Sequence, residues 1–162
     1  MRVYLIRHGK AERDAPTGRD DDRPLKPRGI RQATWLGEAI AKLKKKPGVL
    51  LSSPIVRALD TGRILGQTLK LELDVRDELS TRHNVSDMLK LLMAKAEEHS
   101  PRAVAIVGHN PTLEIAASAL LGGSSSPIVL RTGEALVIDI DDVAKLGSGM
   151  LHKRLRCDED DD

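Results

Sequence analysis

Short runs of apolar residues alternate along this chain with longer segments in which apolar residues recur every three or four positions. The short runs predict buried strands, because a strand covered on both faces carries apolar side chains at successive positions. These strands are expected at Val3–Ile6, Val49–Leu51, Leu71–Val75 and Ala103–Val107. The longer segments have helical spacing and predict helices over residues 29–45, 54–69 and 110–121, with a further helix beginning at an N-cap at Ser86.

The C-terminal part predicts a hairpin, in which Ile128–Arg131 and Ala135–Ile140 flank the turn Thr132-Gly133-Glu134. Before it, strands and helices alternate, and this order favours a mostly parallel sheet with helices on both faces. The hairpin would add antiparallel pairing, so the sheet is expected to be mixed. The predicted fold class is therefore α/β, a three-layer α/β/α sandwich around a mostly parallel, mixed central sheet.

No internal repeat or linker interrupts this pattern, so residues 1–157 are expected to form a single domain. The chain has 162 residues, 40% of them hydrophobic, which suits one packed core. The polar stretch Asp14–Pro27 is expected to be a mobile loop. Residues 158–162 are all acidic and are expected to form a disordered tail. Without that tail, residues 1–156 carry 26 Lys and Arg against 19 Asp and Glu, so the body of the chain is basic.

Composition excludes several functional classes. Cys157 is the lone cysteine, which excludes a disulfide scaffold and, with no signal peptide at the N-terminus, indicates the cytoplasm. No apolar run is long enough for a membrane span, since the longest is Ala103–Val107. One Trp, one Tyr and no Phe are too few for the stacking surfaces of single-strand nucleic-acid binders. We therefore expect neither a membrane nor a nucleic-acid partner.

Charged and polar side chains follow each of the four strands predicted before the hairpin. In an open parallel sheet these carboxyl ends meet at one edge, where ligands bind. The segments expected there are Arg7-His8-Gly9, Ser52-Ser53-Pro54 with Arg57, Asp77-Glu78, and Gly108-His109-Asn110-Pro111. Ser53 and Asn110 each precede a proline and are expected to be helix N-caps, which would bring two helix N-termini to the same edge. Two guanidiniums and two helix N-termini predict a site for a phosphate-like dianion.

Each of these residues has a purely structural alternative when it is taken alone. A histidine after a strand is more often structural than catalytic, and Arg57 could be a surface residue. Glu78 could simply pair with Arg76 or Arg82. The combination favours a functional site, because four strand ends supply compatible groups. The two histidines could share a metal ion, but no further ligand pattern accompanies them and nearby arginines would repel a cation, so no metal or cofactor is expected.

The same residues resemble the signature of the histidine phosphatase (phosphoglycerate mutase-like) superfamily. Arg7-His8-Gly9 resembles its N-terminal motif. The later stretches that resemble its pattern are Pro24-Leu25 with Arg28-Gly29 and Gln32-Ala33, Ser52-Ser53-Pro54 with Arg57-Ala58 and Thr61, and Gly108-His109-Asn110. The resemblance covers residues 1 to about 140, and the short chain looks most like the small SixA-type phosphohistidine phosphatases.

The resemblance implies roles for individual residues. His8 would be the nucleophile that attacks phosphorus, while Arg7, Arg57 and His109 would hold the phosphoryl oxygens. Glu78 is the nearest match to the general acid of larger family members. These roles are chemically sound, because a neutral imidazole is a competent nucleophile near pH 7 and phosphoryl transfer depends on positioning and on stabilising charge.

The resemblance also implies an activity, namely a metal-independent phosphatase that acts on phosphohistidine of a protein. An imidazole leaves phosphorus more easily than an alkoxide, so this substrate tolerates a weakly matched acid. The short connections imply an open pocket that could admit a side chain of another protein. Two alternatives remain open, a phosphatase of small phosphomonoesters with the same mechanism and a non-catalytic phosphate-binding module. A monomer is expected.

Overall fold

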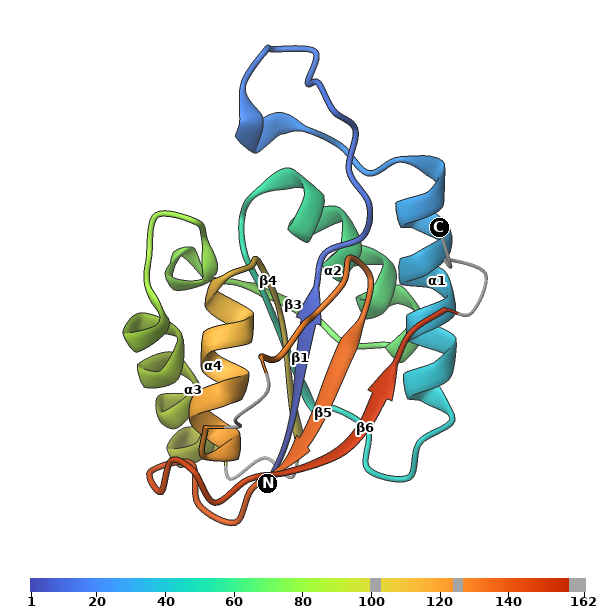
Figure 1. Cartoon of the computed structure of the whole chain (residues 1–162). Coiled ribbons are helices and arrows are strands. Elements are labelled where there is room, and N and C mark those ends of the chain that lie inside the picture. The colour runs from blue at the N-terminus through green and yellow to red at the C-terminus, as the bar shows by residue number, and fades with distance from the viewer. Residues whose placement is uncertain (100–102, 124–126, 158–162) are drawn as a thin grey trace.

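The computed structural model of this chain describes residues 1–99, 103–123 and 127–157 (Figure 1). The predicted tail at residues 158–162 lies outside the described residues. None of the helices in the described part of the chain combines the length and hydrophobicity needed to cross a bilayer.

A six-stranded mixed sheet forms the centre of the molecule. Its strands are β1 (Arg2–Arg7), β2 (Val49–Ser52), β3 (Leu73–Val75), β4 (Ala103–Gly108), β5 (Ala135–Asp139) and β6 (Met150–Leu155), in the order β3-β2-β4-β1-β5-β6. The first four strands pair in parallel, whereas β5 is antiparallel to both β1 and β6. The predicted mostly parallel, mixed sheet is confirmed.

Helices cover both faces of the sheet, as Figure 1 shows. The helices are α1 (Pro27–Ala41) and α2 (Val56–Leu69) on one face, and α3 (Val85–His99) and α4 (Thr112–Leu121) on the other. Side chains of a strand point alternately to the two faces. Accordingly, Val3 and Leu5 of β1 pack into the core beneath α3 and α4, whereas Tyr4 and Ile6 pack into the core beneath α1 and α2. The predicted three-layer architecture is confirmed.

The predicted hairpin is wrong. Ile128–Arg131 forms no strand, and the antiparallel partner of β5 is β6, which the sequence pattern missed. The physical reason is that both sides of β5 are already paired, one with β1 and the other with β6. The turn itself is present, because Gly133 has φ +71 and its N–H donates to the carbonyls of Arg7 and His8 at 3.1 and 2.9 Å. The turn therefore packs against the end of β1.

Three predicted helix caps are also wrong. Ser86 lies inside α3, and Asn84 caps that helix instead, because its Oδ1 accepts a hydrogen bond from the Asp87 N–H at 3.1 Å. Ser53 and Asn110 do not cap α2 and α4, which begin later, at Val56 and Thr112. Both side chains are bound elsewhere at the edge of the sheet, as described below.

Residues 12–24, which we call the arm, project beyond the carboxyl edge of the sheet (Figure 1). The arm leaves and returns through an antiparallel bridge between Ala11 and Leu25, and it contains a short 3₁₀ helix, η1, at Asp20–Asp22. A second 3₁₀ helix, η2 (Asp77–Leu79), follows β3 at the same edge. The segment predicted as a mobile loop thus has a defined hydrogen-bonded path next to the strand ends.

Candidate active site

A pocket of about 240 Å³ opens at the carboxyl edge of the sheet, where β1 and β4 end. The residues that line it are Arg7, His8, Lys10, Ala11, Arg23, Arg57, Thr81, His109, Asn110 and Thr132. Arg7 ends β1, His109 follows β4, and Arg57 lies in the first turn of α2. The structure therefore brings together four of the five predicted site residues, Arg7, His8, Arg57 and His109.

The fifth predicted residue, Glu78, is not among the residues that line the pocket. It lies in η2, where its Oε2 accepts a hydrogen bond from the Nε of Arg76 at 3.2 Å, and its side chain is 38% exposed. The residue that this region contributes to the pocket is Thr81. Glu78 therefore pairs with Arg76, which is the structural role that the sequence analysis gave as the alternative to a catalytic one.

His8 is buried and its ring orientation is fixed by the main chain. Its Nδ1 lies 2.8 Å from the carbonyl oxygen of Gly9. A carbonyl only accepts hydrogen bonds, so Nδ1 carries the proton and Nε2 keeps the lone pair. Gly9 is required here, because a Cβ at this position would lie 2.6 Å from the carbonyl oxygen of Gly29. Burial, and then the nearby charges of Arg57 and Arg7, lower the pKa of His8 to about 4, so the ring is neutral at pH 7.

His109 faces His8, with ring centroids 5.3 Å apart. Its Nε2 lies 2.8 Å from the hydroxyl of Ser53, which also accepts a hydrogen bond from the Ile55 N–H at 3.1 Å. The Ser53 hydroxyl can accept from the Ile55 N–H and donate its own proton to Nε2, and in this arrangement the proton of His109 is on Nδ1. Burial, and then the proximity of His8 and Arg57, lower the pKa of His109 to about 3. The buried Nδ1 has no partner among the described residues, and in this tautomer it is a free hydrogen-bond donor.

Arg7 and Arg57 are each anchored by a hydrogen bond to a main-chain carbonyl. The Nη1 of Arg7 donates to the carbonyl of Leu130 at 3.1 Å, and the Nη1 of Arg57 donates to the carbonyl of Asp20 at 3.1 Å. The Nε atom of each guanidinium is buried without a partner among the described residues. A guanidinium stays charged in proteins, although burial lowers the pKa of both arginines. Each arginine is thus anchored by a main-chain carbonyl, and both side chains line the pocket.

The arm supplies a third guanidinium that the sequence analysis did not identify. Arg23 lines the pocket, donates from Nη1 to the carbonyl of Glu12 at 2.9 Å, and donates from Nε to the carboxylate of Asp20 at 2.9 Å. The same carboxylate lies 3.4 Å from the Nη2 of Arg57. Asp20 therefore links two pocket arginines through its side chain and its main chain, although its 66% exposure screens the charge interaction.

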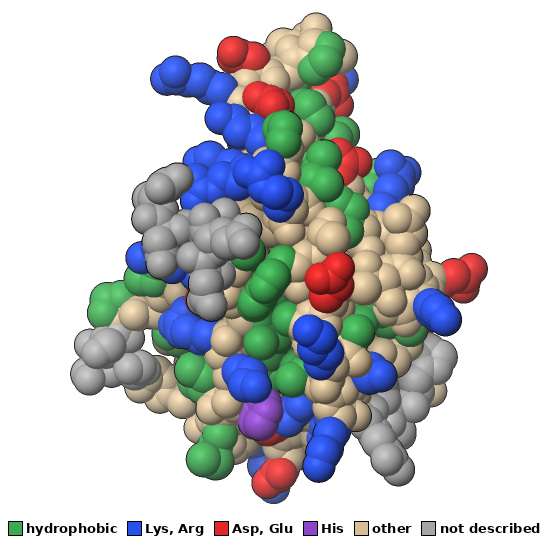
Figure 2. Space-filling model, turned by 90° about the vertical axis from the view of Figure 1, so that its right-hand side faces the viewer, with side chains coloured by type: hydrophobic (Ala, Val, Ile, Leu, Met, Phe, Trp, Pro, Cys, Tyr) green, Lys and Arg blue, Asp and Glu red, His purple; other side chains and the backbone are tan. Residues whose placement is uncertain are grey.

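The surface charge near the pocket suits an anionic ligand. In Figure 2, Lys and Arg side chains gather just below the arm on the face of α1 and β6. Within the described part of the chain, no group of three or more His, Cys, Asp and Glu side chains could hold a metal ion. The charged arginines and the neutral ring of His109 can together bind a tetrahedral dianion. The lone pair on Nε2 of His8 can then attack the central atom of that dianion.

The neutrality of the pocket histidines predicts an unusual titration. Because burial penalises the charged ring, we expect His8 to take up a proton only near pH 4 and His109 only near pH 3. His83 is the internal control, because hydrogen bonds to the carboxylates of Asp87 and Asp77 raise its pKa, so it should hold its proton to higher pH than a free histidine. An NMR titration with assigned imidazole resonances measures all three. A His8 signal that titrates near the ordinary value of 6.5 would contradict the expected buried, neutral nucleophile.

Comparison with known proteins gives consistent matches. The family model described as histidine phosphatase superfamily (branch 1) matches residues 3–86. The chain is 32% identical over 141 residues to the phosphohistidine phosphatase SixA homolog of Haemophilus influenzae (strain ATCC 51907 / DSM 11121 / KW20 / Rd), with 79% of this chain and 81% of that protein covered. It is 31% identical over 127 residues to an uncharacterized protein of Picosynechococcus sp. (strain ATCC 27264 / PCC 7002 / PR-6), covering 77% and 76% of the two chains.

A solved structure is similar over nearly the whole length. It is the protein histidine phosphatase SixA complexed with tungstate, with a TM-score of 0.84 and 25% sequence identity. The match covers 96% of this chain and 97% of that chain.

Proposed function

This chain belongs to the histidine phosphatase superfamily, and from that premise we propose that it is a metal-independent phosphatase that removes phosphate from phosphohistidine on a protein. The reaction would pass through a phosphohistidine on His8. One observation carries the proposal: a buried, neutral His8, whose Nδ1 hydrogen bond leaves the lone pair on Nε2, lines the same pocket as Arg7, Arg57 and His109.

In the first step, the Nε2 of His8 attacks phosphorus and forms an N–P bond. The substrate ring carries a proton on its other nitrogen, so when its P–N bond breaks, the electron pair stays on an imidazole that departs as a neutral molecule. Charge on the equatorial oxygens would be stabilised by Arg7, Arg57 and His109, which line the pocket and are anchored before the reaction begins. The hydrogen bond from His8 Nδ1 to Gly9 stabilises the positive charge that the ring gains.

In the second step, water attacks phosphorus on the side that the leaving group has vacated. The bond between phosphorus and His8 Nε2 breaks, the lone pair returns to the ring, and the proton of water is lost to solvent or to the released phosphate. The same donors stabilise this transition state, because the phosphoryl oxygens do not change place. Two transfers over low barriers would replace one difficult displacement.

The choice of phosphohistidine as substrate rests on the leaving group. An alkoxide leaving group needs a proton donor, and none of the residues that line the pocket is an Asp or Glu. A neutral imidazole is a much better leaving group and needs no such acid. The Haemophilus influenzae relative is named a phosphohistidine phosphatase SixA homolog, which is in line with this preference. A protein-bound side chain also suits a pocket that lies at the sheet edge and reaches only about 240 Å³.

A substrate comparison tests the proposal. We expect kcat/KM for a protein chemically phosphorylated on histidine to exceed that for p-nitrophenyl phosphate and for sugar phosphates by at least about tenfold. Release of inorganic phosphate, followed at equal enzyme concentration and neutral pH, measures all three. A preference for an ester would instead favour the phosphatase of small phosphomonoesters, and binding of phosphate without any turnover would favour a non-catalytic module.

Glu78→Gln is the matched control for this comparison. Because the Glu78 carboxylate is paired with Arg76 and does not line the pocket, turnover of the phosphohistidine protein should be unchanged in this variant. A loss of more than about tenfold would mean that a general acid acts from this position, and the argument from the leaving group would fail.

A further inference from the structure

The peptide group of Leu130 connects the outer helix α4 to the pocket. Its carbonyl accepts hydrogen bonds from the Nη1 of Arg7 at 3.1 Å and from the Nδ2 of Asn110 at 2.8 Å. Its N–H donates to the Oε2 of Glu114 at 2.8 Å. Leu130 itself is buried, with 1% of its surface exposed. The anchor of Arg7 is therefore itself held in place by a carboxylate that does not line the pocket.

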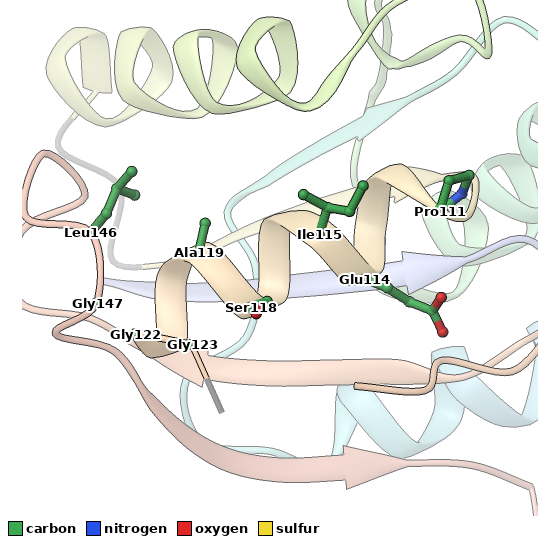
Figure 3. Close-up of a pocket in the computed structure, with 9 residues that line it drawn as sticks. All are labelled: Pro111, Glu114, Ile115, Ser118, Ala119, Gly122, Gly123, Leu146 and Gly147. Atoms are coloured by element: carbon green, nitrogen blue, oxygen red, sulfur yellow. The ribbon is translucent and has the colours of Figure 1, made fainter. Parts of the chain in front are cut away.

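Glu114 lies in the first turn of α4 and points toward this segment. Figure 3 shows its side chain leaving the helix on the opposite side from Ile115, and both residues line the shallow surface groove along α4. Residues 127–131 have no regular secondary structure, so the Leu130 N–H has no partner in a sheet ladder. A buried N–H without a partner is costly, and Glu114 supplies the acceptor.

The charge of Glu114 acts on Arg7 as well. Burial lowers the pKa of Arg7, and the negative charge of Glu114 opposes that effect. The position of the guanidinium is given by the hydrogen bond from Nη1 to the Leu130 carbonyl. The neighbouring N–H of Arg131 is held in a similar way by Glu134, which Arg154 in turn binds at 2.6 Å.

We propose that Glu114 is a positioning residue for Arg7, acting through the Leu130 peptide. Glu114 touches neither the reacting atoms nor the phosphoryl group in this arrangement. Its hydrogen bond fixes the direction of the Leu130 carbonyl, and the carbonyl fixes the guanidinium. The inference rests on the proposed function of the pocket, since it assigns Glu114 a role in binding the phosphoryl group that Arg7 would hold.

Three substitutions at one position test this relay. Glu114→Ala removes the acceptor, Glu114→Asp withdraws the carboxylate by one methylene, and Glu114→Gln keeps an oxygen within reach of the Leu130 N–H. We expect Ala and Asp to weaken binding of inorganic phosphate and to lower kcat/KM by about tenfold to a hundredfold, because small displacements of a positioning group have effects of this size. Gln should restore most of both quantities. Isothermal titration calorimetry measures phosphate binding, and thermal unfolding shows whether each variant is folded.

Glu97→Ala on α3 is the matched control, since Glu97 is an exposed helical carboxylate away from the pocket, and it should bind phosphate normally. If Glu114→Ala does not fold, the comparison of Asp with Gln decides the question. Phosphate binding that is equal in Asp, Gln and the unaltered chain would overturn the inference. So would a Gln variant as weak as Asp, because the hydrogen bond would then not be the cause.

A double-mutant cycle with Arg7→Ala separates a relay from a general loss of order. If Glu114 acts through Arg7, Glu114→Ala should reduce phosphate affinity much less in the Arg7→Ala background than in the unaltered chain. Fully additive effects would overturn the relay. The cycle also distinguishes the two proposals. If Arg7→Ala weakens phosphate binding but Glu114→Ala does not, only the role of Glu114 fails. If Arg7→Ala leaves phosphate binding unchanged, the proposed phosphate pocket fails with it.

Discussion

Replacing His8 by alanine is expected to abolish both turnover and the covalent intermediate. The unaltered chain, incubated with a labelled phosphohistidine protein and quenched in base, should retain a label that is stable in base and lost in acid. His8→Ala has no Nε2 to accept the phosphoryl group, so the label should be absent and kcat should fall by at least about 10⁴-fold, as expected when a nucleophile is removed. We expect the label on Nε2 of His8, because the hydrogen bond from Nδ1 to the Gly9 carbonyl leaves the lone pair on Nε2.

His152→Ala is the matched control, because it removes an exposed histidine of β6 that lies away from the pocket, 3.8 Å from Asp139. This variant should keep both the label and full turnover. A base-stable label that persists in His8→Ala would place the nucleophile elsewhere, and His109 would be the first residue to examine. When Ser53 donates to Nε2, however, the lone pair of His109 is engaged and its Nδ1 carries the proton, so we expect no label there.

The parallel part of the fold could be predicted because burial leaves a clear pattern in the sequence. All six positions of β4 are buried, and β1 is buried at five of its six, so each appears as an unbroken apolar run. The edge strand β6 gives no such signal, because five of its six residues are exposed. Its sequence therefore looks like a loop. Ile128–Arg131 resembles a strand that could pair with β5 because it contains three successive apolar residues, but Leu130 is buried beside the pocket instead.

The candidate site also contains residues that the sequence predicts correctly and one that it does not. Arg7, His8 and His109 could be placed together because they follow two parallel strands, and strand ends meet at one edge of a sheet. Glu78 follows β3 in the sequence as well, but it lies within η2 and its side chain binds Arg76. A strand end fixes where a chain emerges, and it does not fix where a side chain points after a short helical turn.

Residues that act through the main chain escape sequence analysis altogether. Asp20 anchors Arg57 with its carbonyl, and Leu130 anchors Arg7 in the same way. A carbonyl is present at every position, so no residue type identifies it. Arg23 and Glu114 have suitable side chains but lie on a polar arm and on an outer helix, where charged residues are ordinary. A run of Asp residues before Arg23, at residues 20–22, was the one available signal, and it indicated only a polar loop.

Replacing Arg57 by alanine is expected to lower kcat by about 10²- to 10³-fold, the usual cost of one preorganised donor to a developing negative charge. Only 7% of the Arg57 side chain is exposed, and the side chain is anchored to the Asp20 carbonyl, so its position in the pocket is fixed. The loss should appear in kcat more than in KM, because charge on the equatorial oxygens is concentrated in the transition state. Steady-state kinetics with a phosphohistidine protein measure both parameters.

Arg63→Ala is the matched control on the same helix. Its side chain is 63% exposed and lies 3.8 Å from Asp60, so its removal should leave kcat unchanged. Arg57→Lys distinguishes charge from geometry. A lysine keeps the positive charge, but one ammonium group cannot both bind the Asp20 carbonyl and present a second donor to the phosphoryl group. We therefore expect Lys to recover only part of the loss. Full recovery of kcat in Arg57→Lys would mean that Arg57 acts as a simple positive charge. The hydrogen bond that anchors its guanidinium to the Asp20 carbonyl would then have no part in catalysis.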